Sequence, residues 1–299
     1  MGYANIFVAS PCNIAVKNRQ LVIQGEESRR FALEDVNCLM VESHECNVST
    51  YALQALAEAG VAVFVCDRVH MPCGVMLPYK SHFRQLASLR LQLDAPKPLQ
   101  KRLWQSIVER KISNQARCCA LATGSSAGLE AMAKNVLSGD SGNKEAVAAA
   151  LHFRTLFGGG FSRQDEGNGI NALLNYSYAI VRGLIARTLA VYGFEGSIGL
   201  HHNNTFNAFN LADDLIEPFR PVADLFVHSA VEEYGTDLTP QVKRSLFSLT
   251  AADVEIGGRV HSLSYAVELE VQSLARSLKE QTVSLALPSL LPVAVHRYE

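Results

Sequence analysis

Residues 98–122 read PLQKRLWQSIVERKISNQARCCALA, and their apolar side chains repeat with the 3.6-residue period of an α-helix. The same period continues on both sides, and Gly and Pro fall mainly between the periodic segments, as at Gly158–Gly160. The other segments with this period are residues 81–93, 127–137, 143–157, 171–192, 240–249 and 262–281. From residue 77 onward the chain is therefore predicted to be all-α.

The first 76 residues follow a different pattern, in which short β-favouring runs alternate with turn residues. The predicted strands lie within residues 4–10, 13–18, 20–25, 36–43 and 61–67. Between the last two, STYALQALAEAG predicts one helix that Ser49 or Thr50 caps and Gly60 ends. We therefore predict an α+β protein, with a small mainly-β domain over residues 1–76 and a larger helical domain over residues 77–299.

Composition restricts the class of protein. The chain has 299 residues, of which 48% are hydrophobic, so it can bury a large core. No apolar run is long enough to cross a membrane, and the N-terminus lacks the features of a signal peptide. The seven cysteines show no CxxC spacing, and several lie in apolar runs, which indicates reduced core thiols of a cytoplasmic protein.

Charge is distributed unevenly along the chain. The formal net charge is -2, but residues 80–117 contain nine basic and two acidic residues. This window therefore carries +7 and the remainder -9. Such a basic stripe can follow a phosphate backbone, whereas a solvated helical face normally mixes both signs.

Residues 199–221, GLHHNNTFNAFNLADDLIEPFRP, combine imidazole and carboxylate groups within a short span. Asp214 and Glu217 are one helical turn apart, so both carboxylates are expected to point the same way, and Pro218 should end or kink the helix. His202 lies upstream, and Glu145, in the first turn of an alanine-rich helix, is the best candidate for a further ligand. One imidazole with carboxylates suits Mg²⁺ or Mn²⁺ better than Zn²⁺.

Structural roles remain open for the same residues. Glu145 can simply stabilise a helix N-terminus through its charge. Asp213 and Asp214 can be capping or surface residues, and His201 is assigned a packing or hydrogen-bonding role. The concentration of polar groups from Gly199 to Arg220 favours a functional site over these separate explanations.

Several longer motifs support this interpretation. They are WQSIVERKISNQA from Trp104, EAVAAALHFRTLFG from Glu145, FSR at 161–163, NALLNYSYAIVRG from Asn171, and GLHHNNTFNAFNLADDLIEPFRPVAD ending at Asp224. Through these motifs the chain resembles, over nearly its whole length, the "Cas one" family of CRISPR-associated integrases in the form found with type II systems. Ser177 stands where relatives often have Gly, and the net charge is lower than a DNA integrase would suggest.

The resemblance implies an N-terminal domain that mediates homodimerisation and a catalytic helical domain. It implies that Glu145, His202 and Glu217 are the metal ligands and catalytic residues, with Asp214 and His201 in supporting roles. The implied reaction joins the 3′-OH ends of short DNA fragments into a CRISPR array by transesterification. The implied partners are the small bridging protein "Cas two", duplex DNA with 3′ overhangs, and CRISPR repeat DNA. The basic residues expected to contact DNA are Lys80, Arg84, Lys101, Arg102, Lys111, Arg163 and Arg220.

Three other functions are weighed against this one. A structure-specific nuclease would use the same chemistry. A non-catalytic DNA-binding scaffold would not need Glu145, His202 and Glu217 intact. A small-molecule metalloenzyme on a helical bundle would place His152 beside Glu145, but the Glu-x-x-His spacing typical of such bundles is absent.

Overall fold

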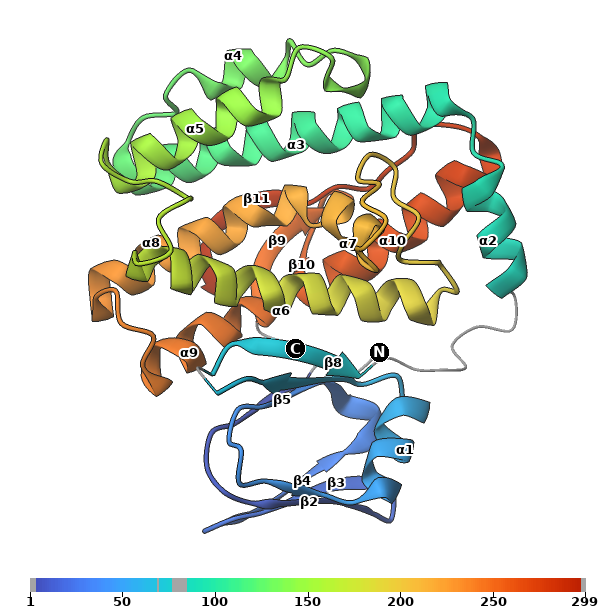
Figure 1. The fold of residues 1–299 in the computed structure, drawn as a ribbon, viewed down its shortest axis with the longest axis vertical. Helices are drawn as coiled ribbons and strands as arrows, with labels where there is room; N and C mark the ends of the chain where they lie inside the picture. The colour runs from blue at the N-terminus through green and yellow to red at the C-terminus, as the bar shows by residue number, and fades with distance from the viewer. Residues whose placement is uncertain (1–3, 69, 77–84, 297–299) are drawn as a thin grey trace.

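The computed structural model describes residues 4–68, 70–76 and 85–296. Strands from the first part of the chain form one end of the molecule, and helices from the remainder form the other (Figure 1). The predicted α+β class is therefore confirmed. The predicted domain boundary falls where strand β8 (Pro72–Met76) ends, and helix α2 (Gln85–Leu93) begins the helical part.

The strand-rich part contains two four-stranded sheets. The first has the order β1-β5-β7-β8, formed by β1 (Ala4–Val8), β5 (Val36–Val41), β7 (Ala62–Cys66) and β8. Its first three strands are parallel and β8 is antiparallel to β7. The second has the order β4-β3-β2-β6, formed by β4 (Ser28–Ala32), β3 (Gln20–Gln24), β2 (Asn13–Lys17) and β6 (Asn47–Val48).

Helix α1 (Thr50–Glu58) begins as predicted. The Ser49 hydroxyl accepts a hydrogen bond from the Ala52 backbone N–H, which satisfies a donor that the first turn cannot pair internally. Ala52 and Leu56, one turn apart, bury the same face of the helix against the sheets. Strands β4, β6 and β8 were not among the predicted strands, because they are short or only partly buried.

Both faces of the first sheet are covered, which explains why all six residues of β5 are buried. Leu39, Val41 and Val63 face the second sheet and α1. Their neighbours Met40 and Phe64 alternate to the opposite face and join the core of the helical part. The first sheet thus contributes residues to the hydrophobic cores of both parts of the molecule.

Ten α-helices are found among the described residues, and α3, α5 and α6 border the site described below. Helix α3 lies along α5 at one side, while α6 lies against the first sheet (Figure 1). The bounds of the helices that follow α2 are α3 (Lys97–Thr123), α4 (Leu129–Ala133), α5 (Lys144–Phe157), α6 (Gly169–Val191), α7 (Asn210–Leu215), α8 (Arg220–Tyr234), α9 (Pro240–Phe247) and α10 (Leu263–Glu280).

A glycine allows α6 to approach the sheet closely. A Cβ atom on Gly183 would lie 2.1 Å from Phe64 Cε1, far inside any van der Waals contact. Phe64 itself is almost completely buried in this contact. Gly183 therefore provides the slot that docks the sheet on the helices.

The larger domain is not made of helices alone, as the sequence had suggested. It contains a three-stranded sheet, ordered β10-β9-β11, formed by β9 (Ala252–Ile256), β10 (Arg259–Ser262) and β11 (Ser289–Val295). Gly257 and Gly258 both have positive φ and form the turn of the β9–β10 hairpin. These strands are short and adjoin helices, so the helical period on either side obscured them.

Two predictions from composition can be compared with the structure. All seven cysteines are free, and five are buried, but Cys46 is only partly buried and Cys73 is exposed, so these two are not core thiols. No helix in the described part of the chain is both long enough and apolar enough to span a membrane.

Candidate metal and DNA site

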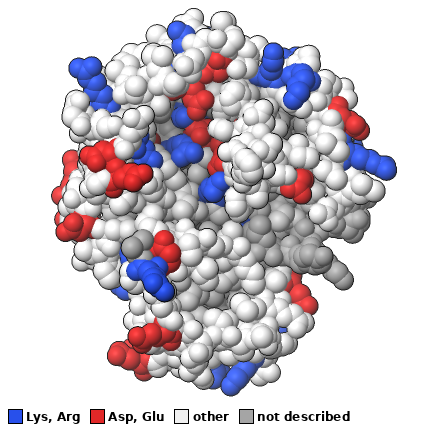
Figure 2. Space-filling view, in the orientation of Figure 1, with Lys and Arg blue, Asp and Glu red and all other residues white. Residues whose placement is uncertain are grey.

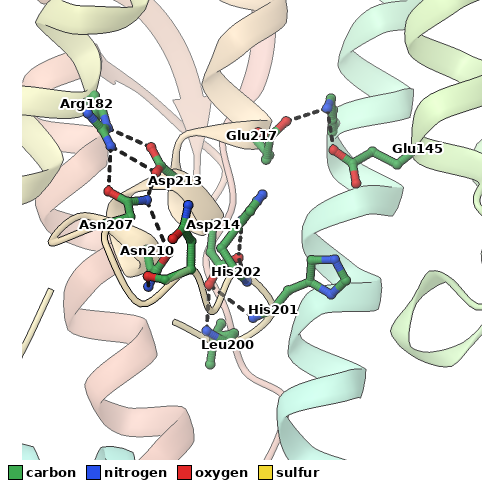
Figure 3. Close-up of polar contacts among 12 residues, drawn as sticks. Glu145, Arg182, Leu200, His201, His202, Asn207, Asn210, Asp213, Asp214 and Glu217 are labelled. Carbon is green, nitrogen blue, oxygen red and sulfur yellow. Dashed lines mark hydrogen bonds and ion pairs between the residues drawn. The ribbon is translucent and has the colours of Figure 1, made fainter. Parts of the chain in front are cut away.

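Glu145 is positioned by the start of α5. The Asp140 carboxylate accepts hydrogen bonds from the backbone N–H groups of Lys144 and Glu145, at 2.8 and 3.0 Å. Asp140 therefore caps the helix in place of the residue next to it, Asn143, which has a left-handed backbone and no capping bond. The capped first turn directs Glu145 toward α3 (Figure 3).

Glu217 is positioned by a break between two helices. Helix α7 ends at Leu215, and Glu217–Phe219 form a single 3₁₀ turn, η3, before α8 begins. Pro218 explains the break, because its ring disfavours α geometry at the preceding residue. The prediction of a kink at Glu217 is confirmed. The Glu217 side chain is 5% exposed, and the guanidinium of Arg220 donates to its Oε1 atom at 2.8 Å.

Lys111, on α3, connects the two glutamates. Its ammonium lies 2.7 Å from Glu145 Oε1 and also forms an ion pair with Glu217 Oε2. In Figure 3 the side chains of Glu145 and Glu217 point toward each other from different elements. Groups that are far apart in sequence therefore converge, as predicted for Glu145 and Glu217, but they converge on a lysine that was expected to contact DNA.

The charges of this group depend on one another. Burial alone would favour the neutral form of Glu217, but the positive charges of Arg220 and Lys111 lower its pKa to about 2. Burial likewise disfavours the charged form of Lys111, yet the negative charges of Glu217 and Glu145 raise its pKa above the ordinary value. Glu217 and Lys111 are therefore both charged at neutral pH.

His202 is held by Asp214. The fully buried Asp214 carboxylate accepts hydrogen bonds from the backbone N–H groups of Leu200, His201 and His202, and lies 2.8 Å from His202 Nδ1 (Figure 3). Gly199 lets the loop approach this closely, because a Cβ there would lie 2.7 Å from Asp214 Oδ2. Asp214 points to this loop, whereas Glu217 points to Lys111, so the expectation that both point the same way is wrong.

The contact with Asp214 sets the chemistry of the His202 ring. The hydrogen bond to Asp214 raises the pKa of His202, and the charge of Glu217 adds to the effect. With Nδ1 engaged, Nε2 is the nitrogen left to bind another group. A carboxylate behind an imidazole is the arrangement that orients metal-binding histidines in many proteins.

His201 has the structural role that was predicted. Its ring stacks on the indole of Trp104, with 4.3 Å between centroids and 1° between planes. Trp104 also meets the His202 ring edge-on at 5.8 Å. Trp104 thus fixes both histidines against α3.

These donors have the chemistry of a hard-cation site. Glu145 and Glu217 offer carboxylate oxygens, His202 offers Nε2, and a positive group already lies between the two carboxylates. No set of three His, Cys, Asp or Glu side chains in the described ranges is already gathered as a metal cluster. The residues fit a Mg²⁺ or Mn²⁺ ion chemically, provided that Lys111 gives way.

Comparison with known proteins identifies the family of this chain. The sequence model of the family "CRISPR associated protein Cas1" matches residues 6–238. Over 306 aligned positions, covering all of both chains, this chain is 40% identical to the CRISPR-associated endonuclease Cas1 of Neisseria meningitidis serogroup C. The chain belongs to the Cas1 family. A Cas1 endonuclease of Pyrobaculum aerophilum is 28% identical over 91% of this chain and 98% of its own length.

Solved structures show the same fold. A casposase bound to its integration product superposes with a TM-score of 0.76 at 20% identity, covering 95% of this chain and 92% of the casposase chain. A Cas1 protein from Thermotoga maritima gives 0.68 at 15% identity, over 93% of this chain and 97% of that one. A chain of a Cas6-RT-Cas1–Cas2 complex gives 0.71 at 16% identity, over 94% of this chain and 35% of that one.

Within this Cas1 chain, the basic residues expected to bind DNA separate into groups. Lys80 and Arg84 lie outside the described residues. Lys101 and Arg102 are exposed on the first half of α3, whereas Lys111 is buried in the site, which contradicts a surface DNA contact. Arg163 donates to Asn171 and Asn175. Arg220 lies between Glu217 and the Tyr178 ring, 4.6 Å from the ring centroid.

The basic residues of the predicted stripe therefore do not share one face of α3. Arg110 donates to Ser289 and Arg117 to the Leu290 carbonyl, so both face β11 and not the surface around Lys101. On the face shown in Figure 2, Lys and Arg atoms are scattered among Asp and Glu atoms and do not form one positive patch.

His152 does not join Glu145, which removes the support for a bundle metalloenzyme. It is fully buried, with Nε2 at 2.8 Å from Asp224 Oδ2 and Nδ1 at 3.3 Å from Cys119 Sγ. The Tyr178 hydroxyl donates to the other Asp224 oxygen. The sequence analysis missed this cluster. Its signal in the sequence was Asp224, an acidic residue among apolar neighbours at the end of the longest motif.

Proposed function

We propose that this Cas1 protein is a metal-dependent DNA integrase of CRISPR adaptation that joins the 3′-OH ends of short DNA fragments into a CRISPR array by transesterification. The observation that carries the proposal is the convergence of Glu145 and Glu217 on one cation, Lys111 Nζ, beside the His202–Asp214 pair. Support comes from the family, from a relative named as an endonuclease, and from the fold shared with a casposase.

Mg²⁺ or Mn²⁺ held by Glu145, Glu217 and His202 would supply Lewis acidity toward a phosphoryl oxygen and lower the pKa of the attacking hydroxyl. The chain's own residues supply the rest. Asp214 fixes the His202 ring so that Nε2 faces away from the loop backbone. Arg220, supported by the Tyr178 ring, and Lys111 place positive charge where negative charge develops on the phosphate. Because one phosphodiester replaces another, no external energy source is needed.

The proposed assembly is a homodimer that acts with the small partner Cas2 on duplex DNA with 3′ overhangs and on CRISPR repeat DNA. Two structural neighbours are named as Cas1–Cas2 complexes, which supports the choice of partner. The exposed Lys101 and Arg102 on α3 are the described cations best placed to hold a DNA backbone. We expect the assembly to act in the cytoplasm.

A second candidate activity is structure-specific cleavage, in which water replaces the 3′-hydroxyl as the attacking group. The name of the Neisseria relative favours it. A scaffold without catalysis is the weaker alternative, because it gives no reason for two glutamates to pair with a single buried lysine.

The test uses purified full-length protein, with and without Cas2, a labelled duplex with 3′ overhangs, and a supercoiled plasmid that contains CRISPR repeats. We expect labelled strands to join the plasmid in Mg²⁺ or Mn²⁺ and joining to stop in EDTA. Glu145→Gln, Glu217→Gln and His202→Ala should each reduce joining by at least about 100-fold, because each removes a proposed ligand.

The matched control is Glu130→Gln, which alters an exposed glutamate on α4. It should join DNA as the wild type does. Cleavage without joining would identify the nuclease, and DNA binding without either reaction would identify the scaffold. Full joining in EDTA would rule out the metal-dependent mechanism.

A further inference from the structure

Lys111 occupies the place where a cation of the proposed metal site is expected. Its side chain is only 8% exposed, and its ammonium contacts a carboxylate from α5 and one from η3. Lysine is seldom buried to this extent without paired acids. In this structure the lysine is what holds the two glutamates together.

The four charged groups of this cluster neutralise one another. Lys111 and Arg220 carry two positive charges, and Glu145 and Glu217 carry two negative charges. A divalent ion added to this arrangement would leave two uncompensated positive charges in a space where water screens poorly. Either a positive group must move out, or an anion must enter with the ion.

Arg220 is the less mobile of the two cations. Its guanidinium donates to Glu217 Oε1 at 2.8 Å and lies over the Tyr178 ring, whose hydroxyl is itself bound to Asp224. Within the described ranges, the Lys111 ammonium pairs with the two carboxylates alone, at the end of a flexible four-carbon chain. Lys111 is therefore the group that can rotate away while its helix remains in place.

We propose that Lys111 is an internal counter-ion that holds Glu145 and Glu217 together before the metal binds, and that the divalent cation displaces its ammonium onto an incoming DNA phosphate. The inference rests on the proposed function. It predicts that metal and DNA bind cooperatively, because the phosphate neutralises the displaced lysine while the glutamates neutralise the metal.

The experiment measures Mn²⁺ binding to the full-length protein by electron paramagnetic resonance, with and without a duplex whose 3′ ends are dideoxy-terminated and cannot react. For the wild type we expect Mn²⁺ to bind at least about tenfold more tightly when DNA is present. Lys111→Met should bind Mn²⁺ at least about tenfold more tightly than the wild type without DNA, and should gain less from DNA.

Tighter Mn²⁺ binding by Lys111→Met would distinguish the counter-ion role from a structural role, because damage to the fold would weaken Mn²⁺ binding. Lys111→Gln serves as a second neutral variant if the Met variant does not fold, and Lys111→Arg should restore weak binding without DNA. Lys134→Met, which removes an exposed lysine at the end of α4, is the matched control and should bind Mn²⁺ as the wild type does.

Two outcomes have distinct meanings. Equal or weaker Mn²⁺ binding by a folded neutral variant of Lys111 would overturn the counter-ion role while leaving the metal site in place. Failure of the wild type to bind Mn²⁺ even with DNA would overturn the proposed metal-dependent function itself.

Discussion

His152 is a buried residue that is connected to the site through hydrogen-bonded neighbours. It lies between Asp224 and Cys119, and Asp224 also accepts from Tyr178, over which Arg220 is stacked. Burial alone would favour neutral imidazole, but the hydrogen bond to Asp224 raises the pKa of His152 to about 9. The charged form therefore stabilises the folded protein at neutral pH.

This pKa predicts how stability depends on pH. Because the folded pKa lies above the unfolded value of about 6.5, the contribution is complete below about pH 6.5 and is lost as pH rises to about 9. Relative to His152→Gln, the wild-type free energy of unfolding should fall by up to about 1.4 kcal/mol per pH unit in this window. Urea denaturation across the window measures it. A difference between the two proteins that is constant with pH would show that His152 is not the titrating group.

The paired elements α6 and β7 show how the helices and the sheet are joined. Gly183 on α6 and Phe64 on β7 fit so closely that no larger residue can replace the glycine without movement. The sheet and the site lie on opposite sides of α6. A change in this contact should therefore alter the free energy of unfolding without touching the site.

Gly183→Ala should lower the free energy of unfolding by about 1–3 kcal/mol, because the added methyl group forces α6 and β7 apart. Urea denaturation measures the loss. Gly160→Ala is the control, since a Cβ there meets nothing within 4 Å. Adding Phe64→Leu to Gly183→Ala should recover part of the loss, and no recovery would place the strain elsewhere.

For the whole molecule, net charge and charge placement decide how DNA can bind. A protein with a formal charge of -2 has no overall attraction for a polyanion, so binding must depend on a few local cations. Lys101 and Arg102 are adjacent and exposed on the part of α3 that leads to the site.

Reversing both charges, as Lys101→Glu with Arg102→Glu, should weaken DNA binding regardless of sequence. Each lost phosphate contact should reduce the slope of log affinity against log salt by about 0.9 on duplex DNA. Fluorescence anisotropy at several salt concentrations measures the slope. The same double reversal at Arg29 and Arg30, two exposed residues of β4, is the control, and equal effects of both pairs would indicate non-specific repulsion.

Much of this arrangement could be predicted from sequence, because local patterns and motifs determine it. The kink at Glu217 follows from Pro218, and the cap at Ser49 follows from its position before an apolar run. The burial of Lys111 was missed because the basic residues of α3 were considered together. Ile107, Val108 and Gln115, three or four residues away from it along α3, are buried, so the period could have placed Lys111 inside. Its pairing with Glu145 and Glu217 depends on tertiary contacts that no local pattern encodes.

The sheet shared by the two parts of the molecule has a consequence for dissection of the protein. Because Met40 and Phe64 belong to the same core as the helices, a truncated protein that begins at residue 85 would expose the Phe64 slot on α6 and the apolar surface beside it. Removal of the strands would therefore produce a fragment that aggregates through its exposed apolar surface, and not a shorter active protein. The two parts, produced as separate chains, should likewise associate with each other until denaturant separates them.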